Sequence, residues 1–312
     1  MMTDNRINIL PNDKSGNPMA EVFRREYIFF KPRFNNYREV SRSTANEVLD
    51  REEWAECEAV LCLPDSYTED GEATPLILSC HGAGPTVSEE KRMIGGLPYA
   101  IECIRAGFAV LDVSGCEPHG ITLGCPEHVF ALYKAYRHAV KNYNLSERVL
   151  LAGHSMGAQT VINFANTFPS LSVALAVFNP GLSLEPVRVD DHVCRNPWDR
   201  VVANNRPYRE KIAKYFRFPS EEWCEENVSG FDPYRTRSFI NSDGKRAVIP
   251  PCPVKIWQGA DDMTVDPVMT REYYDSIRRA GCYAELHILD GVKHTVTAVM
   301  KKELLLWFKR FI

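Results

Sequence analysis

The alternation of apolar, strand-like runs with helix-like segments constrains the fold of this chain more than any other feature of its sequence. Segments with apolar residues at helical spacing, such as 126–143 and 267–280, separate short runs that are apolar on both faces. Strands of that kind, joined through helices, build a mostly parallel sheet with helices on both faces, so the predicted fold class is α/β. The predicted strands are 59–63, 75–80, 107–113, 148–152, 172–178, 254–258 and 283–289.

One connection between two of these strands is too long for a simple crossover. About 75 residues separate Phe178 from Val254, whereas a crossover needs on the order of a dozen or more. The connection is rich in aromatic residues and has helix-like patterns at 207–216 and 220–226. This composition favours an insert that covers the substrate entrance of the domain.

These patterns divide the chain into three parts. We expect residues 51–181 and 251–312 to form one α/β domain and residues 182–250 to form a helical, cap-like insert within it. Residues 1–50 are polar and mixed, with one strand-like run at Tyr27–Phe30, and are interpreted as an N-terminal extension.

Charge and hydropathy exclude several classes of partner. The formal net charge of the 312 residues is −4 at pH 7, which gives no electrostatic reason to expect nucleic acid or acidic lipid. No apolar run reaches the roughly 18–20 residues that a membrane-spanning helix needs, and Met1–Lys14 lacks the apolar core of a secretory signal. The sequence therefore predicts a cytoplasmic protein whose partner is a small molecule, and it leaves the oligomeric state open.

Motifs for metals and nucleotides do not occur in the sequence. The ten cysteines are scattered without a C-x-x-C pair, which is typical of buried, reduced thiols. There is no H-E-x-x-H and no G-x-x-x-x-G-K-[ST] segment. We therefore expect neither a metal nor another cofactor.

The strongest local signal is the segment Gly-His-Ser-Met-Gly at residues 153–157, which matches G-x-S-x-G. It lies between an apolar strand and a helix, where this motif turns the chain sharply and presents a serine hydroxyl. Ser155 is therefore the predicted nucleophile, and the amide of Met156, directly after it, is a predicted donor to the oxyanion of the reaction.

A serine hydroxyl needs a base, and in this architecture the base follows the nucleophile and the acid along the chain. Three histidines follow Ser155. His192 falls in the insert, and His287 alternates within a strand, where a core or surface role explains it better. His294 lies in the loop after that strand, so His294 is the predicted base.

The acid should lie in the loop after the preceding strand. That loop offers Asp261, Asp262 and Asp266, and the spacing alone does not choose among them, because each is also a suitable turn-capping carboxylate.

Over residues 55–180 and 250–312 the chain resembles the α/β-hydrolase superfamily, in particular its esterase, dienelactone-hydrolase-like and prolyl-oligopeptidase-like branches. Those proteins carry the acid in a G-x-x-D-x-x-V pattern, which matches Gly259, Asp262 and Val265. The resemblance implies that Asp262 is the acid, with Asp261 in reserve.

The second oxyanion donor should come from the loop after the strand 75–80. The segment His-Gly-Ala-Gly at residues 81–84 resembles the H-G-x-G loop of the superfamily, which implies Ala83 as the donor, with Gly82 as the alternative. His81 is expected to brace this loop, and Asp112 to shape a turn near the site without taking part in the chemistry.

These residues together predict a serine hydrolase that cleaves a carboxylic ester of a small or medium substrate. A prolyl-oligopeptidase-like peptidase and an acyltransferase use the same residues and remain alternatives. A non-catalytic binding protein on a hydrolase scaffold is the alternative from another class, because a fold alone does not establish a function.

Overall fold

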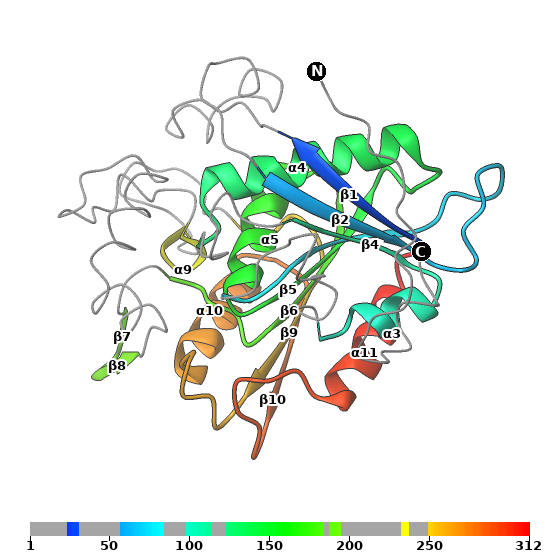
Figure 1. The fold of residues 1–312 in the computed structure, drawn as a ribbon. Helices are drawn as coiled ribbons and strands as arrows, with labels where there is room; N and C mark the ends of the chain where they lie inside the picture. Colours follow the sequence, from blue (N-terminus) through cyan, green and yellow to red (C-terminus); the bar gives the residue numbers. More distant parts are fainter. Residues whose placement is uncertain are drawn as a thin grey trace.

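An eight-stranded sheet forms the centre of the described part of the molecule (Figure 1). The computed structural model describes residues 24–30, 57–83, 98–113, 123–183, 187–194, 232–236 and 249–312. The strand order is β1-β2-β4-β3-β5-β6-β9-β10. The strands are β1 (Arg24–Phe30), β2 (Cys57–Leu63), β3 (Leu76–Cys80), β4 (Ala109–Val113), β5 (Val149–His154), β6 (Ser172–Phe178), β9 (Val254–Gly259) and β10 (Ala284–Leu289).

The sheet is parallel from β4 to β10, and β2 and β1 continue it antiparallel at the β4 side. The residues of β3, β4 and β9 are all buried, as the apolar runs predict for strands covered on both faces. The predicted α/β class with a mostly parallel sheet is therefore confirmed.

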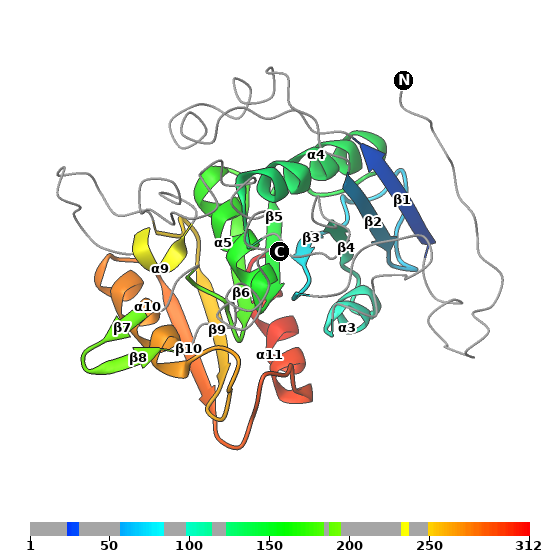
Figure 2. The ribbon, with the colours of Figure 1, turned by 60° about the vertical axis from the view of Figure 1, so that its left-hand side comes forward.

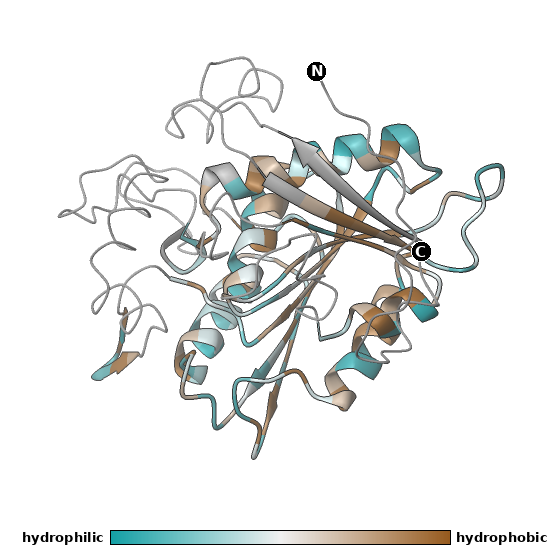
Figure 3. Ribbon diagram, viewed as in Figure 1, coloured by the Kyte–Doolittle hydropathy of each residue, from teal (hydrophilic) through white to brown (hydrophobic). Residues whose placement is uncertain are grey.

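Helices cover both faces of this sheet (Figure 2). On one face, α4 (Pro126–Asn142), α5 (Met156–Thr167) and α10 (Pro267–Arg279) pack against the strands in one core cluster, and on the other face α3 (Ala100–Arg105) and α11 (Ala298–Phe308) form a second cluster. Hydrophobic residues gather in the strands, while the outward turns of the helices are hydrophilic (Figure 3). None of the helices in the described residues combines the length and the apolar character that crossing a bilayer requires.

The first strand joins the sheet, although it falls in the segment 1–50 that the sequence assigns to an extension. All seven residues of β1 pair with β2, from Arg24 opposite Leu63 to Phe30 opposite Cys57. The strand-like run at Tyr27–Phe30 is thus the edge of the central sheet.

The predicted insert 182–250 is described only in pieces. A hairpin forms from β7 (Val187–Val189) and β8 (His192–Cys194), and a short helix α9 (Pro233–Thr236) follows. The helices predicted at 207–216 and 220–226 lie outside the described residues, so the expected cap stays a prediction.

The parallel strands bring the carboxyl ends of β3, β5, β6, β9 and β10 to the same edge of the sheet. In open α/β sheets, ligands bind at this edge, outside the strand ends. The loops that begin here carry Gly82, Ser155, Asp262 and His294.

Candidate active site

Ser155 occupies a sharp turn between β5 and α5. Its backbone has φ 56° and ψ −121°, a left-handed conformation that a residue other than glycine adopts at a cost of about 1–3 kcal/mol. Hydrogen bonds hold the turn in place: the Ser155 amide donates to the Phe178 carbonyl over 2.9 Å, and the Ser155 carbonyl accepts from the amides of Ala158 and Gly181. Such strain concentrates at functional sites, where the surrounding structure supports it.

The two glycines of the turn are required by close packing. A Cβ at Gly153 would lie 2.5 Å from the Gly157 carbonyl oxygen, and a Cβ at Gly157 would collide with the carbonyl oxygen of Cys80. Helix α5 can therefore approach β3 and β5 backbone to backbone only with glycine at both positions. This approach fixes the start of α5, and with it Met156, directly behind the serine.

His294 reaches Ser155 from the loop that follows β10. Its Nε2 lies 2.9 Å from the Ser155 Oγ, and its Nδ1 lies 2.7 Å from Oδ2 of Asp262. The side chain of His294 is 20% exposed, whereas that of Asp262 is fully buried. Substrate can therefore reach the imidazole while the carboxylate behind it is shielded from water.

Asp262 is held by hydrogen bonds on both carboxylate oxygens. Oδ1 accepts from the amides of Thr264 (2.7 Å) and Val265 (2.9 Å), and Oδ2 accepts from His294 and from Nε2 of Gln258 (3.2 Å). Burial raises the pKa of this carboxyl, but the bonds from His294 and the two amides outweigh burial, so its pKa lies below the ordinary value. Asp262 is therefore ionised at neutral pH.

The other two aspartates of this loop lie elsewhere. Asp261 is exposed, and its amide donates to the carbonyl of Val292. Asp266 is the N-cap of α10, with Oδ1 accepting from the Val268 amide over 3.0 Å. Of the three candidates from the sequence, Asp262 is the one that the structure brings to His294.

Two polar residues that sequence reasoning missed support the triad geometry. Gln258, at the end of β9, donates to Asp262 and accepts from the Thr270 hydroxyl over 2.8 Å. Asn179, directly after β6, is completely buried; its Oδ1 accepts from the Gly259 amide (2.8 Å) and its Nδ2 donates to the Thr295 carbonyl (2.9 Å). Asn179 thus connects the strand that leads to the acid with the residue after the base.

The predicted oxyanion loop lies against the serine. A Cβ built on Gly82 would lie 3.4 Å from the Cβ of Ser155. Ala83 is exposed, and Gly84 falls outside the described residues. Met156 is the first residue of α5 and is buried. Gly82 and the start of α5 therefore both lie next to Ser155.

A second histidine–aspartate pair lies under this loop. His81 and Asp112 are both buried, and Nδ1 of His81 lies 3.3 Å from Oδ1 of Asp112. Burial raises the pKa of Asp112, although the charge of His81 and a hydrogen bond from His81 act in the opposite direction. The pair joins the end of β3 to β4, in keeping with a bracing role for His81.

His154, the variable residue before the nucleophile, packs beside the base. The ring centroids of His154 and His294 are 5.0 Å apart. Burial, followed by the charge of His294, lowers the pKa of His154 to about 4. A neutral His154 ring therefore borders the imidazole of His294 at pH 7.

The remaining histidines after Ser155 have other partners. His287 is a surface residue of β10 whose Nδ1 lies 2.8 Å from Glu303. His192 lies in the hairpin, 2.9 Å from Oδ2 of Asp266. Within the described part of the chain, His192, Cys194 and Asp266 are the one group of three side chains with the donor atoms and spacing to hold a metal ion.

Comparison with known proteins identifies the fold. No protein-family model matches the sequence, and no curated protein matches it. Several solved structures do superpose on it. S-formylglutathione hydrolase from Agrobacterium tumefaciens gives a TM-score of 0.59 at 13% identity, over 93% of this chain and 99% of that one. The esterase Est2 from Thermogutta terrifontis gives 0.53 at 14% identity, over 90% and 92% of the two chains.

Peptidases superpose on the chain as well, over a smaller part of their own length. Dipeptidyl peptidase 4 from Porphyromonas gingivalis gives a TM-score of 0.56 at 13% identity, over 93% of this chain and 36% of the peptidase. At these identities the likeness concerns the fold. The strand order, the helices on both faces and these superpositions show that the chain has the α/β-hydrolase fold.

Proposed function

We propose that this protein is a serine hydrolase that cleaves a carboxylic ester through an acyl-enzyme on Ser155. One observation carries the proposal: the chain of contacts from the Ser155 Oγ to Nε2 of His294 (2.9 Å) and from Nδ1 of His294 to Asp262 (2.7 Å). These are the distances at which a base removes a proton from a hydroxyl and an acid orients that base.

The ionised state of Asp262 sets the direction of proton transfer. An ionised carboxylate accepts the Nδ1–H of His294, so Nε2 is left without a proton and accepts the Ser155 hydroxyl. As the serine oxygen attacks the acyl carbon, the proton passes to Nε2, and Asp262 stabilises the resulting imidazolium. His294 then returns the proton to the alcohol that leaves.

Water completes the reaction by the same route in reverse order. It attacks the acyl-enzyme, gives a proton to His294, and releases the carboxylic acid as Ser155 recovers its hydrogen. In both halves the tetrahedral oxyanion is stabilised by the Met156 amide and by an amide of the loop at Gly82 and Ala83. No step requires a cofactor.

Ester cleavage is preferred over the alternatives because of the extent of the structural likeness. The hydrolase and the esterase are matched over 99% and 92% of their lengths, but dipeptidyl peptidase 4 over only 36%. Peptide cleavage and acyl transfer to an alcohol use the same acyl-enzyme and remain outcomes that the experiments below distinguish.

An active-site-directed fluorophosphonate tests the hydrolase itself. We expect the wild-type protein to be labelled and Ser155→Ala to be unlabelled, while the exposed Ser66→Ala variant serves as a matched control and labels like the wild type. Absence of labelling on well-folded wild-type protein would contradict the proposal and favour a binding protein on the same scaffold.

A substrate panel then separates the reaction classes. We expect p-nitrophenyl esters of graded acyl length to be hydrolysed, with a preference for short or medium chains, and aminoacyl-proline amides to be cleaved at least about a hundredfold more slowly. Faster cleavage of the amides would make the protein a peptidase. Acylation of an added alcohol in preference to water would make it an acyltransferase.

A further inference from the structure

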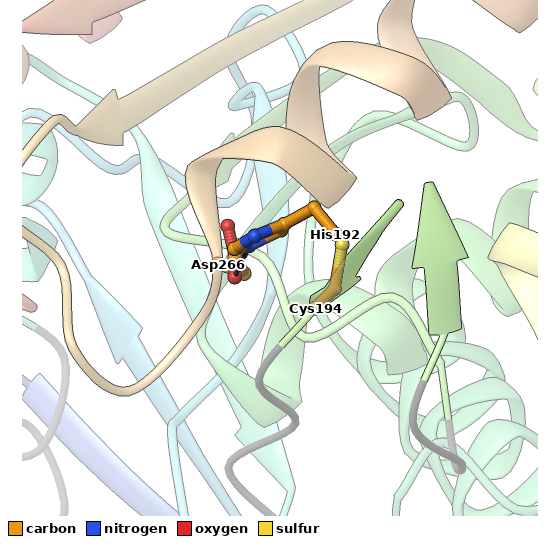
Figure 4. A group of neighbouring side chains, drawn as sticks. All are labelled: His192, Cys194 and Asp266. Atoms are coloured by element: carbon orange, nitrogen blue, oxygen red, sulfur yellow. Dashed lines mark hydrogen bonds and ion pairs between the residues drawn. The ribbon is translucent and has the colours of Figure 1, made fainter. Parts of the chain in front are cut away.

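Three side chains outside the triad converge at the start of α10. Figure 4 shows His192 and Cys194, both from β8, beside Asp266. Their potential ligand atoms all lie within 4.8 Å of one another. His192 and Cys194 are two positions apart on a strand, so their side chains leave the same face, and the hairpin directs that face at Asp266.

The carboxylate of Asp266 is held by one oxygen, which leaves the other oxygen oriented toward the hairpin. Oδ1 caps α10 by accepting from the Val268 amide over 3.0 Å, and this bond holds the side chain while Oδ2 faces His192. A side chain anchored by one oxygen presents the other at little further cost in conformational entropy. Backbone contacts that hold ligands in this way are typical of metal sites.

The donor set selects the class of ion. One thiolate, one imidazole and one carboxylate suit a borderline ion such as Zn²⁺ and exclude Mg²⁺ and Ca²⁺, which take oxygen ligands. A thiolate and a carboxylate together carry two negative charges, which balance a divalent cation. We propose that His192, Cys194 and Asp266 form a binding site for a zinc-class divalent ion that fastens the β7–β8 hairpin to α10.

The ligand atoms must shift to accept the ion, because they now lie within 4.8 Å of one another and not at tetrahedral spacing. Ligand atoms arranged tetrahedrally around zinc are about 3.3–3.8 Å apart. The His192 Nε2 and the Asp266 Oδ2, now 2.9 Å apart, must separate by about half an ångström, and the side chain of His192 is 54% exposed and can move. Three protein ligands leave one tetrahedral position for water.

Binding displaces protons that the ion-free protein holds. The thiol proton of Cys194 is released to solvent, and the proton on Nε2 of His192 is exchanged for one on Nδ1, so that Nε2 becomes the ligand. Burial, followed by the charge of Asp266, raises the pKa of the Cys194 thiol to about 11. The ion therefore competes with a firmly held proton, and titrations must extend well beyond one equivalent.

The site lies four positions after Asp262 along the chain. From Asp266 the chain continues into α10, whose Thr270 hydroxyl contacts Gln258, which in turn donates to Asp262. An ion at Asp266 would thus fix the helix that supports the acid of the triad. Ion binding does not depend on the proposed hydrolase activity, because none of its three ligands touches Ser155 or His294 in the described contacts.

Co²⁺ and Zn²⁺ binding to the 312-residue chain, dialysed against a chelator, tests the site. We expect Co²⁺, titrated well beyond one equivalent, to give the charge-transfer absorption of a thiolate ligand, and Zn²⁺ to abolish this absorption by displacement and to raise the Tm. Ser155→Ala should bind in the same way, so that failure of the metal site and failure of the hydrolase are seen separately.

The variants decide which residues hold the ion. Cys194→Ser should lose the thiolate absorption, and His192→Ala and Asp266→Asn should each weaken Zn²⁺ binding by about tenfold or more. Asp266→Asn keeps a side chain that can cap the helix. If Cys194→Ser does not fold, His192→Ala still tests the site, because the exposed His192 side chain can be removed with little loss of packing. Cys282→Ser and His287→Ala are the matched controls. The proposal is overturned if folded wild-type protein shows no thiolate absorption, or if Cys194→Ser retains it.

Discussion

The histidine–aspartate pair at Ser155 and the pair that joins the end of β3 to β4 differ in what surrounds them. His294 and Asp262 are 2.7 Å apart, with the imidazole partly exposed and hydrogen bonded to the serine. His81 and Asp112 are 3.3 Å apart and wholly enclosed beneath the loop that holds Gly82. One of these two pairs is thus hydrogen bonded to the Ser155 hydroxyl, and the other is enclosed at the end of β3.

Asp262 and Asp112 have the same kinds of partner but opposite pKa shifts. Each accepts from an imidazole and from two backbone amides, yet the pKa of Asp262 lies below the ordinary value, whereas burial raises the pKa of Asp112. Desolvation disfavours the charged form of a carboxyl group, and hydrogen bonds favour it. The pair next to the Ser155 hydroxyl is thus the one whose carboxylate is favoured in its charged form.

The largest effect is expected when the imidazole that accepts the serine proton is removed. We predict that His294→Ala lowers kcat for an ester substrate by about 10⁴–10⁶-fold, because among the described residues His294 is the histidine hydrogen bonded to the Ser155 hydroxyl. His287→Ala, at the surface of β10, is the matched control and should stay within about twofold. The measurement is steady-state hydrolysis of a p-nitrophenyl ester, and equal losses in the two variants would contradict the assignment.

The next effect removes the charge behind the base. Asp262→Asn should lower kcat by roughly 10²–10⁴-fold, since the amide favours the wrong tautomer of His294. The neighbouring Asp261→Asn should change kcat by less than about threefold, because that side chain is exposed and does not contact His294 in the described interactions. If Asp261→Asn is the more damaging substitution, the acid has been assigned to the wrong residue.

A smaller effect tests whether Asn179 positions the triad. We predict that Asn179→Ala lowers kcat by about 10–100-fold and changes KM by less than about threefold, because misplacement of a reacting group by an ångström costs about a hundredfold. Asn179→Asp keeps the acceptor for Gly259 and loses the donor to Thr295, so it should lie between Ala and the wild type.

Fluorophosphonate labelling provides the second readout for Asn179. Its rate at Ser155 should fall in proportion to kcat, while the exposed Asn142→Ala control labels at the wild-type rate. A parallel rise in KM, or a loss of stability with an unchanged labelling rate, would assign Asn179 a purely structural role.

The smallest expected effect is a difference between Asp262 and Asp112 in how the unfolding free energy depends on pH. An aspartate in the unfolded chain has a pKa of about 3.9. Because the pKa of Asp262 is lower in the folded than in the unfolded protein, Asp262 stabilises the fold above about pH 4. The unfolding free energy of Asp262→Asn should therefore lie below that of the wild type by a constant amount above about pH 4, and this difference should shrink as the pH falls further. The raised pKa of Asp112 has the opposite effect: as the pH rises above about 4, the wild type should lose stability relative to Asp112→Asn.

Urea unfolding of the wild type and both variants between pH 3 and pH 7 measures these differences. The comparison fails if the two differences change in the same direction over the same pH range. Asn at either position retains a side-chain acceptor, so the variants chiefly remove the charge.

Local patterns were sufficient for the parallel strands of the sheet and for the choice of Ser155 and His294 as candidate site residues. The apolar runs matched the parallel strands within about two residues, because a strand buried on both faces has few polar residues to obscure it. Ser155 and His294 could be chosen from the motif and the chain order. Asp262 could be chosen over Asp261 only by the resemblance, because two adjacent loop carboxylates differ in where their side chains point, which the sequence pattern does not reveal.

The supporting residues could not be predicted in the same way. Gln258 and Asn179 act through contacts with residues distant in the sequence, as in the bond from Asn179 to Thr295 across 116 positions. Their one sequence signal is that both are polar and lie at the carboxyl ends of apolar strands. The role of β1 was missed for a different reason: an antiparallel edge strand has no helix before the next strand to mark it as part of the sheet.

The distance along the chain between nucleophile and base has a consequence for biosynthesis. Ser155 and His294 are 139 positions apart, and the acid also follows β9. A ribosome-bound chain that has folded as far as β6 would present the serine with neither of its partners, so the proposed hydrolysis would begin only after β9, β10 and the loop that follows β10 have docked. Undocking of this C-terminal segment would therefore abolish the proposed activity without any change at Ser155.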